Sequence, residues 1–329
     1  MSSPVSTVGN AEASPVLLLD HVNLNVRAWS DELARFWWDA LGCVSDPRTP
    51  SILATNVAGG CSMQGLQWAN IGLQQVHMCV GEPEEADQSM ANGIVGVSFP
   101  DLAELKKRLD SIGAAWVEDM ERTDLVGAGL TGRSIRFSSP TDVRFRAHEA
   151  ARGAQWFGPL GAKDAGCCQP GGLSTGLGIG YVEFAVPTGS AAGIGRFYER
   201  TLGIPALVTG GCCRVAMRTG QFLLFRETAA EIPAYDGHHI CFCMSFSLCV
   251  CARARARVQL CLCVAATDAW AAVDVGALPD DTTASFSAMY VVELMKIPLK
   301  ILCGSLYQNQ SGNSSWRLFQ RILMLSPSL

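Results

Sequence analysis

Alternating apolar and polar residues near the start of the chain predict a strand followed by a helix. The segment 17–26 reads LLLDHVNLNV, and the strict alternation of its second half is typical of a half-buried strand. Ser30 then stands at the position of a helix N-cap, and apolar residues recur at helical spacing up to Gly42. A glycine directly after the last apolar residue is typical of a helix end. We therefore expect a strand over 17–26 and a helix over 31–41.

The same order of elements continues along the chain and is then repeated. Two further strands are predicted around Gly72, over 67–71 and 74–80. The second copy has a strand over 93–99, a helix from Pro100 to Gly113, and strands over 115–119, 134–137 and 143–148. Each copy is about 60 to 70 residues long, a size at which one unit alone buries too little of its surface. We therefore expect the two copies to pair their sheets.

The beginning of the chain also recurs in its second half. The segment YVEFAV at 181–186 aligns with HVNLNV at 21–26, and RFYERTLG at 196–203 aligns with RFWWDALG at 35–42. Internal duplication of this kind indicates repeated structural units. A third copy is therefore predicted from residue 179, and a fourth begins at Asp236 and soon loses the pattern.

From about residue 243 the chain becomes a low-complexity alternation of cysteine, arginine and alanine. A dinucleotide repeat in DNA gives such an alternation when it is translated. We hypothesise that 243–329 derives from a retained intron or a shifted reading frame, which spliced transcript reads with an intact frame would refute. The cysteines at 241–263 have two-residue spacings, unlike the three-residue steps of a zinc knuckle, so we expect no evolved metal site in this cluster.

Composition and charge exclude several classes of protein. Hydrophobic residues make up 49% of the chain and charged residues 17%, as in a globular protein and unlike a disordered or coiled-coil chain. The net charge of −5 makes nucleic acid an unexpected partner. No apolar run has the length of a membrane span, and the polar residues 1–16 do not resemble a secretory signal. We therefore expect an intracellular, cytoplasmic protein with reduced cysteines and no membrane partner.

Together these patterns predict an α+β chain of paired strand and helix units, the second pair disrupted by the abnormal C-terminal tail. The predicted organisation is a disordered polar tail over 1–16, a first domain of two units over 17–150, a linker over 151–178, a partial second domain over 179–242 and a poorly ordered tail over 243–329.

The order of a few residues resembles that of a known superfamily. His21 lies on the first predicted strand, the first helix ends at Gly42, and a later strand carries Gln75 and His77. In duplicated units, this constellation resembles the vicinal oxygen chelate superfamily, which includes glyoxalase I, extradiol dioxygenases, and bleomycin and fosfomycin resistance proteins. The resemblance covers the first predicted domain and part of the second. It implies paired βαβββ units whose sheets curve into half-open barrels around a small-molecule ligand.

The resemblance also implies a divalent metal held by side chains of equivalent strands. The matching positions in the first unit are His21 and His77, and imidazoles suit zinc, iron, nickel or manganese. In the second unit the position of a carboxylate ligand is taken by Arg146, whose charge would repel a metal. His148 shares the face of Arg146 and is an alternative ligand, whereas Glu149, on the opposite face, is a candidate base.

Two functions follow as alternatives. In the first, the metal acts as a Lewis acid on neighbouring oxygens of a substrate, as in a lyase, isomerase or dioxygenase. In the second, the protein binds a small molecule without metal, as bleomycin resistance proteins do. Gln75, Trp68 and Arg146 are candidate substrate contacts in either case. Each candidate also has a structural alternative: hydrogen-bonded strand residues for His21, His77 and Gln75, helix–sheet packing for Trp68, and a solvated outer face for Arg146.

Overall fold

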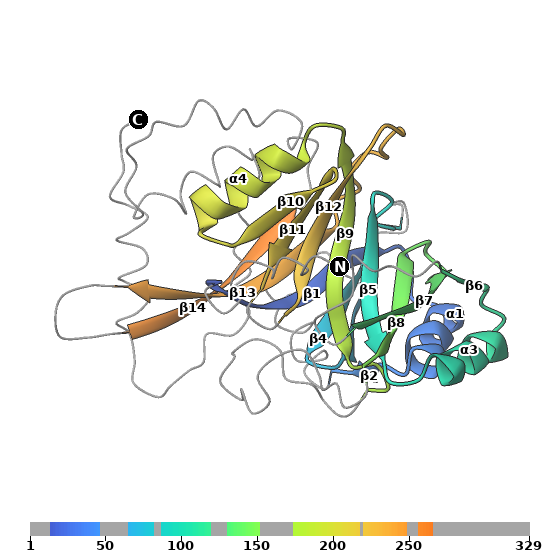
Figure 1. Ribbon diagram of the computed structural model, residues 1–329. Helices are drawn as coiled ribbons and strands as arrows, with labels where there is room; N and C mark the ends of the chain where they lie inside the picture. Colours follow the sequence, from blue (N-terminus) through green and yellow to red (C-terminus); the bar gives the residue numbers. More distant parts are fainter. Residues whose placement is uncertain are drawn as a thin grey trace, which may run out of the picture. The chain divides into compact units, whose positions relative to one another are not determined.

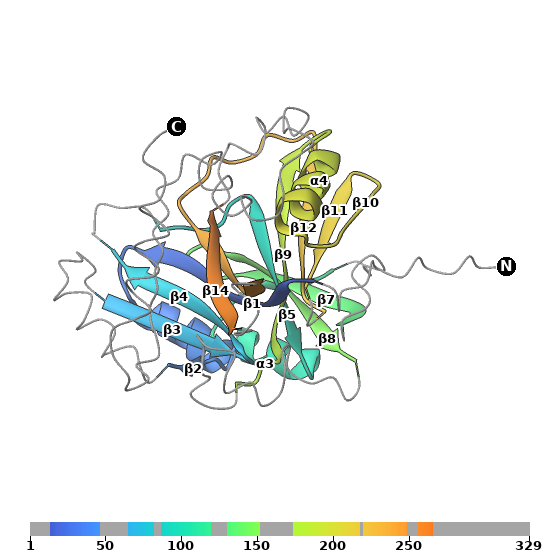
Figure 2. The ribbon, with the colours of Figure 1, turned by 90° about the vertical axis from the view of Figure 1, so that its left-hand side faces the viewer.

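The computed structural model describes residues 14–46, 65–81, 87–119, 130–151, 174–217, 220–248 and 256–265. All of them belong to one compact unit, Met1–Leu299. They form two mixed β-sheets with few helices, an α+β architecture (Figures 1 and 2). Within these ranges, no helix is both long and apolar enough to cross a membrane. Most of the predicted polar tail and of the predicted linker lies outside the described residues.

The first sheet combines the beginning of the chain with its last described strands. Across the sheet the order is β14 (Ala256–Ala265), β13 (His239–Leu248), β1 (Val16–Val26), β4 (Gln74–Val80), β3 (Gly65–Ile71) and β2 (Val44–Ser45). The strand β1 runs antiparallel to β13 on one side and parallel to β4 on the other. Side chains of β1 therefore have neighbours from both ends of the described chain.

The second sheet has two halves of matching strand order. Across the sheet the order is β10 (Ala206–Thr209), β11 (Cys212–Ala216), β12 (Phe222–Thr228), β9 (Gly178–Pro187), β5 (Gly93–Phe99), β8 (Arg144–Ala150), β7 (Leu130–Ser138) and β6 (Trp116–Glu118). The antiparallel pair β5 and β9 lies at the centre, and each of the two has a parallel neighbour on its outer side, β8 and β12. The two halves are thus the strands of the second and third predicted units.

The units pair differently from our expectation. We expected the two units within 17–150 to pair with each other, but β5 pairs with β9, and β1 pairs with β13. Loop-closure entropy grows only with the logarithm of loop length, so a distant partner costs little more free energy than a near one. Proximity in the sequence therefore does not decide which unit completes a sheet. As a result, the first unit shares its sheet with residues of the fourth.

Part of the predicted aberrant tail forms regular structure. The strands β13 and β14 are 10 residues long each and pair antiparallel with each other. The prediction of a poorly ordered tail over 243–329 stays a prediction, since the rest of that segment lies outside the described residues. Alternation of apolar and polar residues with period two favours a strand, whatever the coding origin of the segment.

The helices begin and end near the predicted residues. They are α1 (Asp31–Ala34), the π-helix η2 (Arg35–Ala40), α3 (Leu102–Ser111) and α4 (Ala191–Leu202). The Ser30 hydroxyl accepts the Leu33 amide proton, which confirms the predicted N-cap. The expected single helix over 31–41 widens after one turn, and the Leu41 amide donates to the Phe36 carbonyl five residues earlier. Gly42 ends this helix with a left-handed φ of 60°.

The helix η2 joins the two sheets through an aromatic core. Phe36 and Trp37 are each 1% exposed. The Phe36 ring centroid lies 5.9 Å from that of Phe145 on β8 and 6.2 Å from that of Phe137 on β7. Figure 1 shows α1 and α3 together beside β6–β8, while α4 lies against β10–β12. Because strand residues alternate, the first sheet buries apolar residues on one face and carries polar residues on the other.

Candidate functional site

The polar face of the first sheet gathers side chains from four strands. We use the name polar face for Asp20, His21, Trp68, Asn70, Gln75, His77 and Cys241. His21 on β1 stands opposite Gln75 on β4 and opposite Cys241 on β13. His77 on β4 stands opposite Trp68 on β3. The register of the sheet therefore brings the predicted residues His21, Gln75, His77 and Trp68 together, and adds Cys241 to them.

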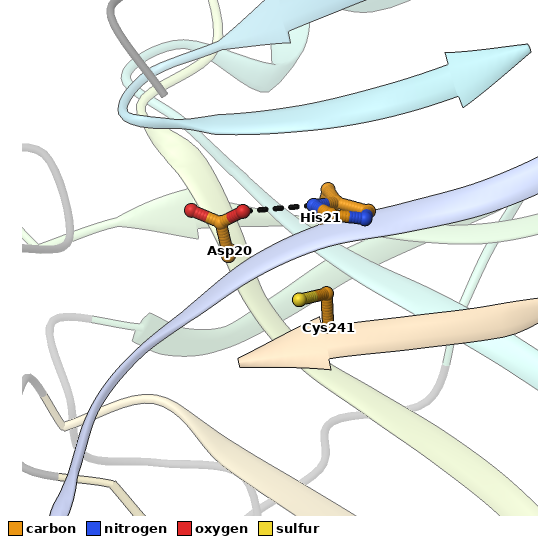
Figure 3. Close-up of side chains that lie close together, drawn as sticks. All are labelled: Asp20, His21 and Cys241. Carbon is orange, nitrogen blue, oxygen red and sulfur yellow. Dashed lines mark hydrogen bonds and ion pairs between the residues drawn. The ribbon is translucent and has the colours of Figure 1, made fainter. Parts of the chain in front are cut away.

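Asp20 joins the polar face because β1 carries a bulge. Leu19 pairs with Phe242 and His21 with Cys241, so β1 has one residue more than β13 at this point. A bulge takes the extra residue out of strict alternation. Figure 3 shows the Asp20 and His21 side chains close together, with the Cys241 side chain reaching toward them from β13. The His21 Nδ1 donates to Asp20 Oδ2 at 2.8 Å, and Asp20 is only 2% exposed.

His21 lies at the end of a column of stacked rings. Its imidazole centroid lies 3.8 Å from that of His77, with 18° between the ring planes. The His77 ring in turn stacks on the Trp68 indole, at 4.2 Å and 10°. The histidine pair is thus close together, as the resemblance implied, and Trp68 packs against His77. Stacking fixes the plane in which the His21 nitrogens lie.

The stacked arrangement does not allow His21 and His77 to chelate one metal ion. A metal binds an imidazole nitrogen in the plane of the ring, at about 2.0–2.1 Å. Two nearly parallel rings that face each other direct their nitrogen lone pairs side by side, and not toward a common point. His77 also donates from Nε2 to Gln75 Oε1 at 2.9 Å. His77 therefore supports His21 in this arrangement, and the two rings do not form a ligand pair.

Gln75 connects His77 to a buried hydrogen-bond network. Its Nε2 donates to Asp46 Oδ2 at 2.6 Å and to Asn70 Oδ1 at 2.5 Å. Because this amide nitrogen is the donor, Oε1 is the acceptor from His77, and His77 carries its proton on Nε2. Gln75 is 1% exposed, and its hydrogen bond to His77 fixes the position of the stacked rings. Its observed role is that of a cross-strand hydrogen-bond partner.

The second sheet places Arg146 and His148 in a separate buried cluster. Arg146 is 5% exposed, and its Nε donates to Asp119 Oδ2 at 2.6 Å. Its Nη1 lies 3.2 Å from the Tyr181 hydroxyl and 3.3 Å from Glu183 Oε2. His148 Nε2 contacts the same hydroxyl at 2.8 Å. The two residues therefore share one face, as alternation predicted, but Arg146 is not on a solvated outer face.

This cluster does not fit a metal ion. Burial by itself would lower the pKa of Arg146, but Tyr181, Glu183 and Asp119 raise it above its ordinary value. A permanent cation, already paired with two carboxylates, therefore lies where the resemblance placed a metal ligand. Two nitrogens of Arg146 are committed to protein carboxylates, which favours a structural role over a contact with substrate.

Glu149 belongs to neither of these two clusters of polar residues. It belongs to β8 of the second sheet, and Arg133 Nη1 donates to its Oε2 at 2.6 Å. This ion pair is largely exposed on the arginine side. Neither Glu149 nor His148 lies on the strands that carry His21 and His77, so the structure does not unite the full predicted set.

Comparison with solved structures finds several chains whose backbones match part of this one. A Bacillus subtilis protein assigned as a dioxygenase matches with a TM-score of 0.44 and 14% identity, over 67% of this chain and 66% of that chain. A glyoxalase I variant from Zea mays matches with a TM-score of 0.41 and 13% identity, over 65% of this chain and 70% of that chain. The fosfomycin resistance protein FosX from Mesorhizobium loti matches with a TM-score of 0.27 and 16% identity, over 41% of this chain and 92% of that chain.

This chain thus spans slightly less than two thirds of the Bacillus subtilis protein. No protein-family model matches the sequence, and no curated protein matches it. At these identities and TM-scores, the ligands of the matched proteins do not carry over to this protein. The solved structures that this chain resembles include glyoxalase, dioxygenase and fosfomycin resistance proteins, at low sequence identity.

Proposed function

We propose that the polar face of the first sheet binds a small oxygen-bearing molecule at a divalent metal ion, and that His21 is a ligand of this metal. The observation that carries the proposal is the burial of polar groups: Asp20 is 2% exposed, and Asn70 and Gln75 are 1% exposed each. Burying such groups costs about 1–3 kcal/mol each where hydrogen bonds do not compensate. Here hydrogen bonds join Asp20 to His21 and Gln75 to Asn70, and a buried polar network on one sheet face is typical of a functional site.

The surroundings of His21 support its assignment as the ligand. Its side chain keeps 12% exposure, so an ion can reach it. The stacked His77 ring fixes the plane of the His21 ring, and a fixed ring orientation favours metal binding. When bound, the metal would act as a Lewis acid on neighbouring oxygens of the substrate, the chemistry of lyases, isomerases and dioxygenases. We propose no role as a base for Glu149, because it lies on the other sheet.

Metal-free binding of a small molecule is the second candidate function. The observation that favours it is the stacking of His21 on His77, in which each imidazole ring packs against the other and no metal ion is needed to hold them together. In this version Trp68, at the other end of the column, provides a flat apolar surface for a ligand. The metal content of the purified protein distinguishes the two functions.

Elemental analysis of the full chain tests the proposed function. We expect one divalent metal ion per chain in the wild type, and less than a tenth of that in His21→Ala. The control is Asn25→Ala, on the same strand and face as His21, which should keep the metal. The full chain is required because β13 completes the sheet. Equal metal in His21→Ala and wild type would contradict the proposal, and a metal-free wild type that still binds small anions and diols would favour the second candidate.

A further inference from the structure

We infer that the metal is held by Asp20, His21 and Cys241, and that it is zinc or a divalent transition metal of similar softness. This inference rests on the proposed function and names the ligands of that site. One potential ligand atom from each of the three residues lies within 4.8 Å of the other two. The three residues are the carboxylate, the imidazole and the thiol drawn in Figure 3.

Two features of the fold create this set. The register of β1 and β13 places Cys241 directly opposite His21. The bulge in β1 turns the Asp20 carboxylate to the same side, where regular alternation would direct it to the other face. Neither feature belongs to the two-histidine arrangement that the sequence suggested. The site therefore depends on a contact between the first predicted unit and the fourth.

The donor atoms decide which metals fit. Thiolate and imidazole ligands select zinc and other transition metals, whereas magnesium and calcium prefer sites made of oxygen alone. Asp20 and Cys241 are 2% and 0% exposed, so both ligands are shielded from water. Three protein ligands would leave room on the metal for an oxygen of the bound molecule, as in catalytic zinc sites.

The same arrangement gives His77 a different role from the one first predicted. Its ring lies parallel to His21 at 3.8 Å, and its Nε2 is bonded to Gln75. His77 thus holds the plane of the His21 ring without contacting the metal, and it is a positioning residue. Removing His77 should weaken metal binding less than removing a ligand does.

Cobalt binding to the reduced full chain tests the ligand set. Co²⁺ replaces zinc in such sites, and a cobalt–thiolate bond gives a strong near-ultraviolet charge-transfer band. We expect one equivalent of Co²⁺ to produce this band in the wild type and in Cys79→Ser, a cysteine of the neighbouring strand β4. In Cys241→Ser the band should disappear. In Asp20→Asn it should persist with more than about 10-fold weaker affinity, because a neutral amide replaces a carboxylate ligand, and even the loss of a supporting group costs about 10- to 100-fold.

The cobalt experiment distinguishes failure of the inferred ligand set from failure of the proposed metal site. A band that persists in Cys241→Ser, or cobalt bound by the wild type without any band, overturns the inferred ligand set. If cobalt is nevertheless lost in His21→Ala, the proposed function stands without Cys241 as a ligand. A wild type that binds no cobalt overturns both. Far-ultraviolet circular dichroism of each variant separates loss of a ligand from loss of the fold, and Asp20→Asn provides a test that does not depend on Cys241→Ser folding.

Discussion

Replacing Arg146 by methionine is expected to lower the free energy of unfolding by about 3 kcal/mol, the lower end of the range for breaking a buried ion pair. The guanidinium lies 2.6 Å from Asp119 and 3.3 Å from Glu183, and both carboxylates are at most 10% exposed. Without Arg146, Asp119 still pairs with Arg136 and Glu183 with Arg226, and both of these arginines are more exposed than Arg146. Urea unfolding of the full chain measures the difference.

The matched control for this substitution is Arg136→Met. Arg136 pairs with the same Asp119 carboxylate, at 3.1 Å, but its side chain is 54% exposed. An exposed ion pair contributes only about 0–1 kcal/mol, so this variant should unfold nearly as the wild type does. Equal losses in the two variants would contradict the structural role that its burial and ion pairs assign to Arg146.

Replacing Phe36 by alanine is expected to cost about 3–5 kcal/mol of unfolding free energy, because it removes a fully buried ring and leaves a cavity. Phe36 extends from η2 to Phe137 and Phe145, so its loss loosens the contact between the helix of the first unit and the second sheet. Thermal and urea unfolding of the wild type and the variant, fitted with the same baselines, measure the difference in unfolding free energy.

The control for this variant is Trp38→Ala. Trp38 lies in the same helix but is only partly buried, at the edge of the core beside Trp29. Although tryptophan is the larger side chain, its removal should cost less than the removal of Phe36. A larger loss for Trp38→Ala than for Phe36→Ala would mean that η2 makes its main hydrophobic contact through Trp38. That result would contradict the burial of Phe36 in the core.

Local structure was readable from the sequence wherever a residue acts on its own neighbours. The alternation in 17–26 predicted β1, and Ser30 and Gly42 marked both ends of the first helix. These signals depend on hydrogen bonds and backbone angles within a few residues, so they survive in any tertiary context. The π-helical turn was missed, because a regular helical spacing describes both helix types over so short a segment.

The partner of each sheet could not be predicted from the same signals. Each unit has an edge strand with apolar residues, and the local sequence does not indicate which edge strands pair with each other. The pairing of β1 with β13 determined which residues approach His21, and it added Cys241 from the cysteine cluster at 241–263, whose spacing had indicated no metal site. The repeat within 17–150 suggested a partner that the structure does not use.

The candidate site was therefore predicted only in part. His21, His77, Gln75 and Trp68 lie on one face because strand alternation and the register of neighbouring strands place them together. Asp20 was missed since only a bulge brings it to this face. The signal that was available is the sequence Asp-His within a strand, a pair that regular alternation would separate.

The central claim is that β1 and β13 lie side by side, so that residues of the first and fourth units share the polar face. Cysteine cross-linking of the His21→Cys variant tests it most directly. Cα atoms of opposite residues in antiparallel strands lie about 4.5–5.5 Å apart, within the range that a disulfide spans. Peptide mass mapping after mild oxidation of the full chain should find residue 21 linked to Cys241 as the main product. A folded variant that links residue 21 to other cysteines, or to none, would contradict the account.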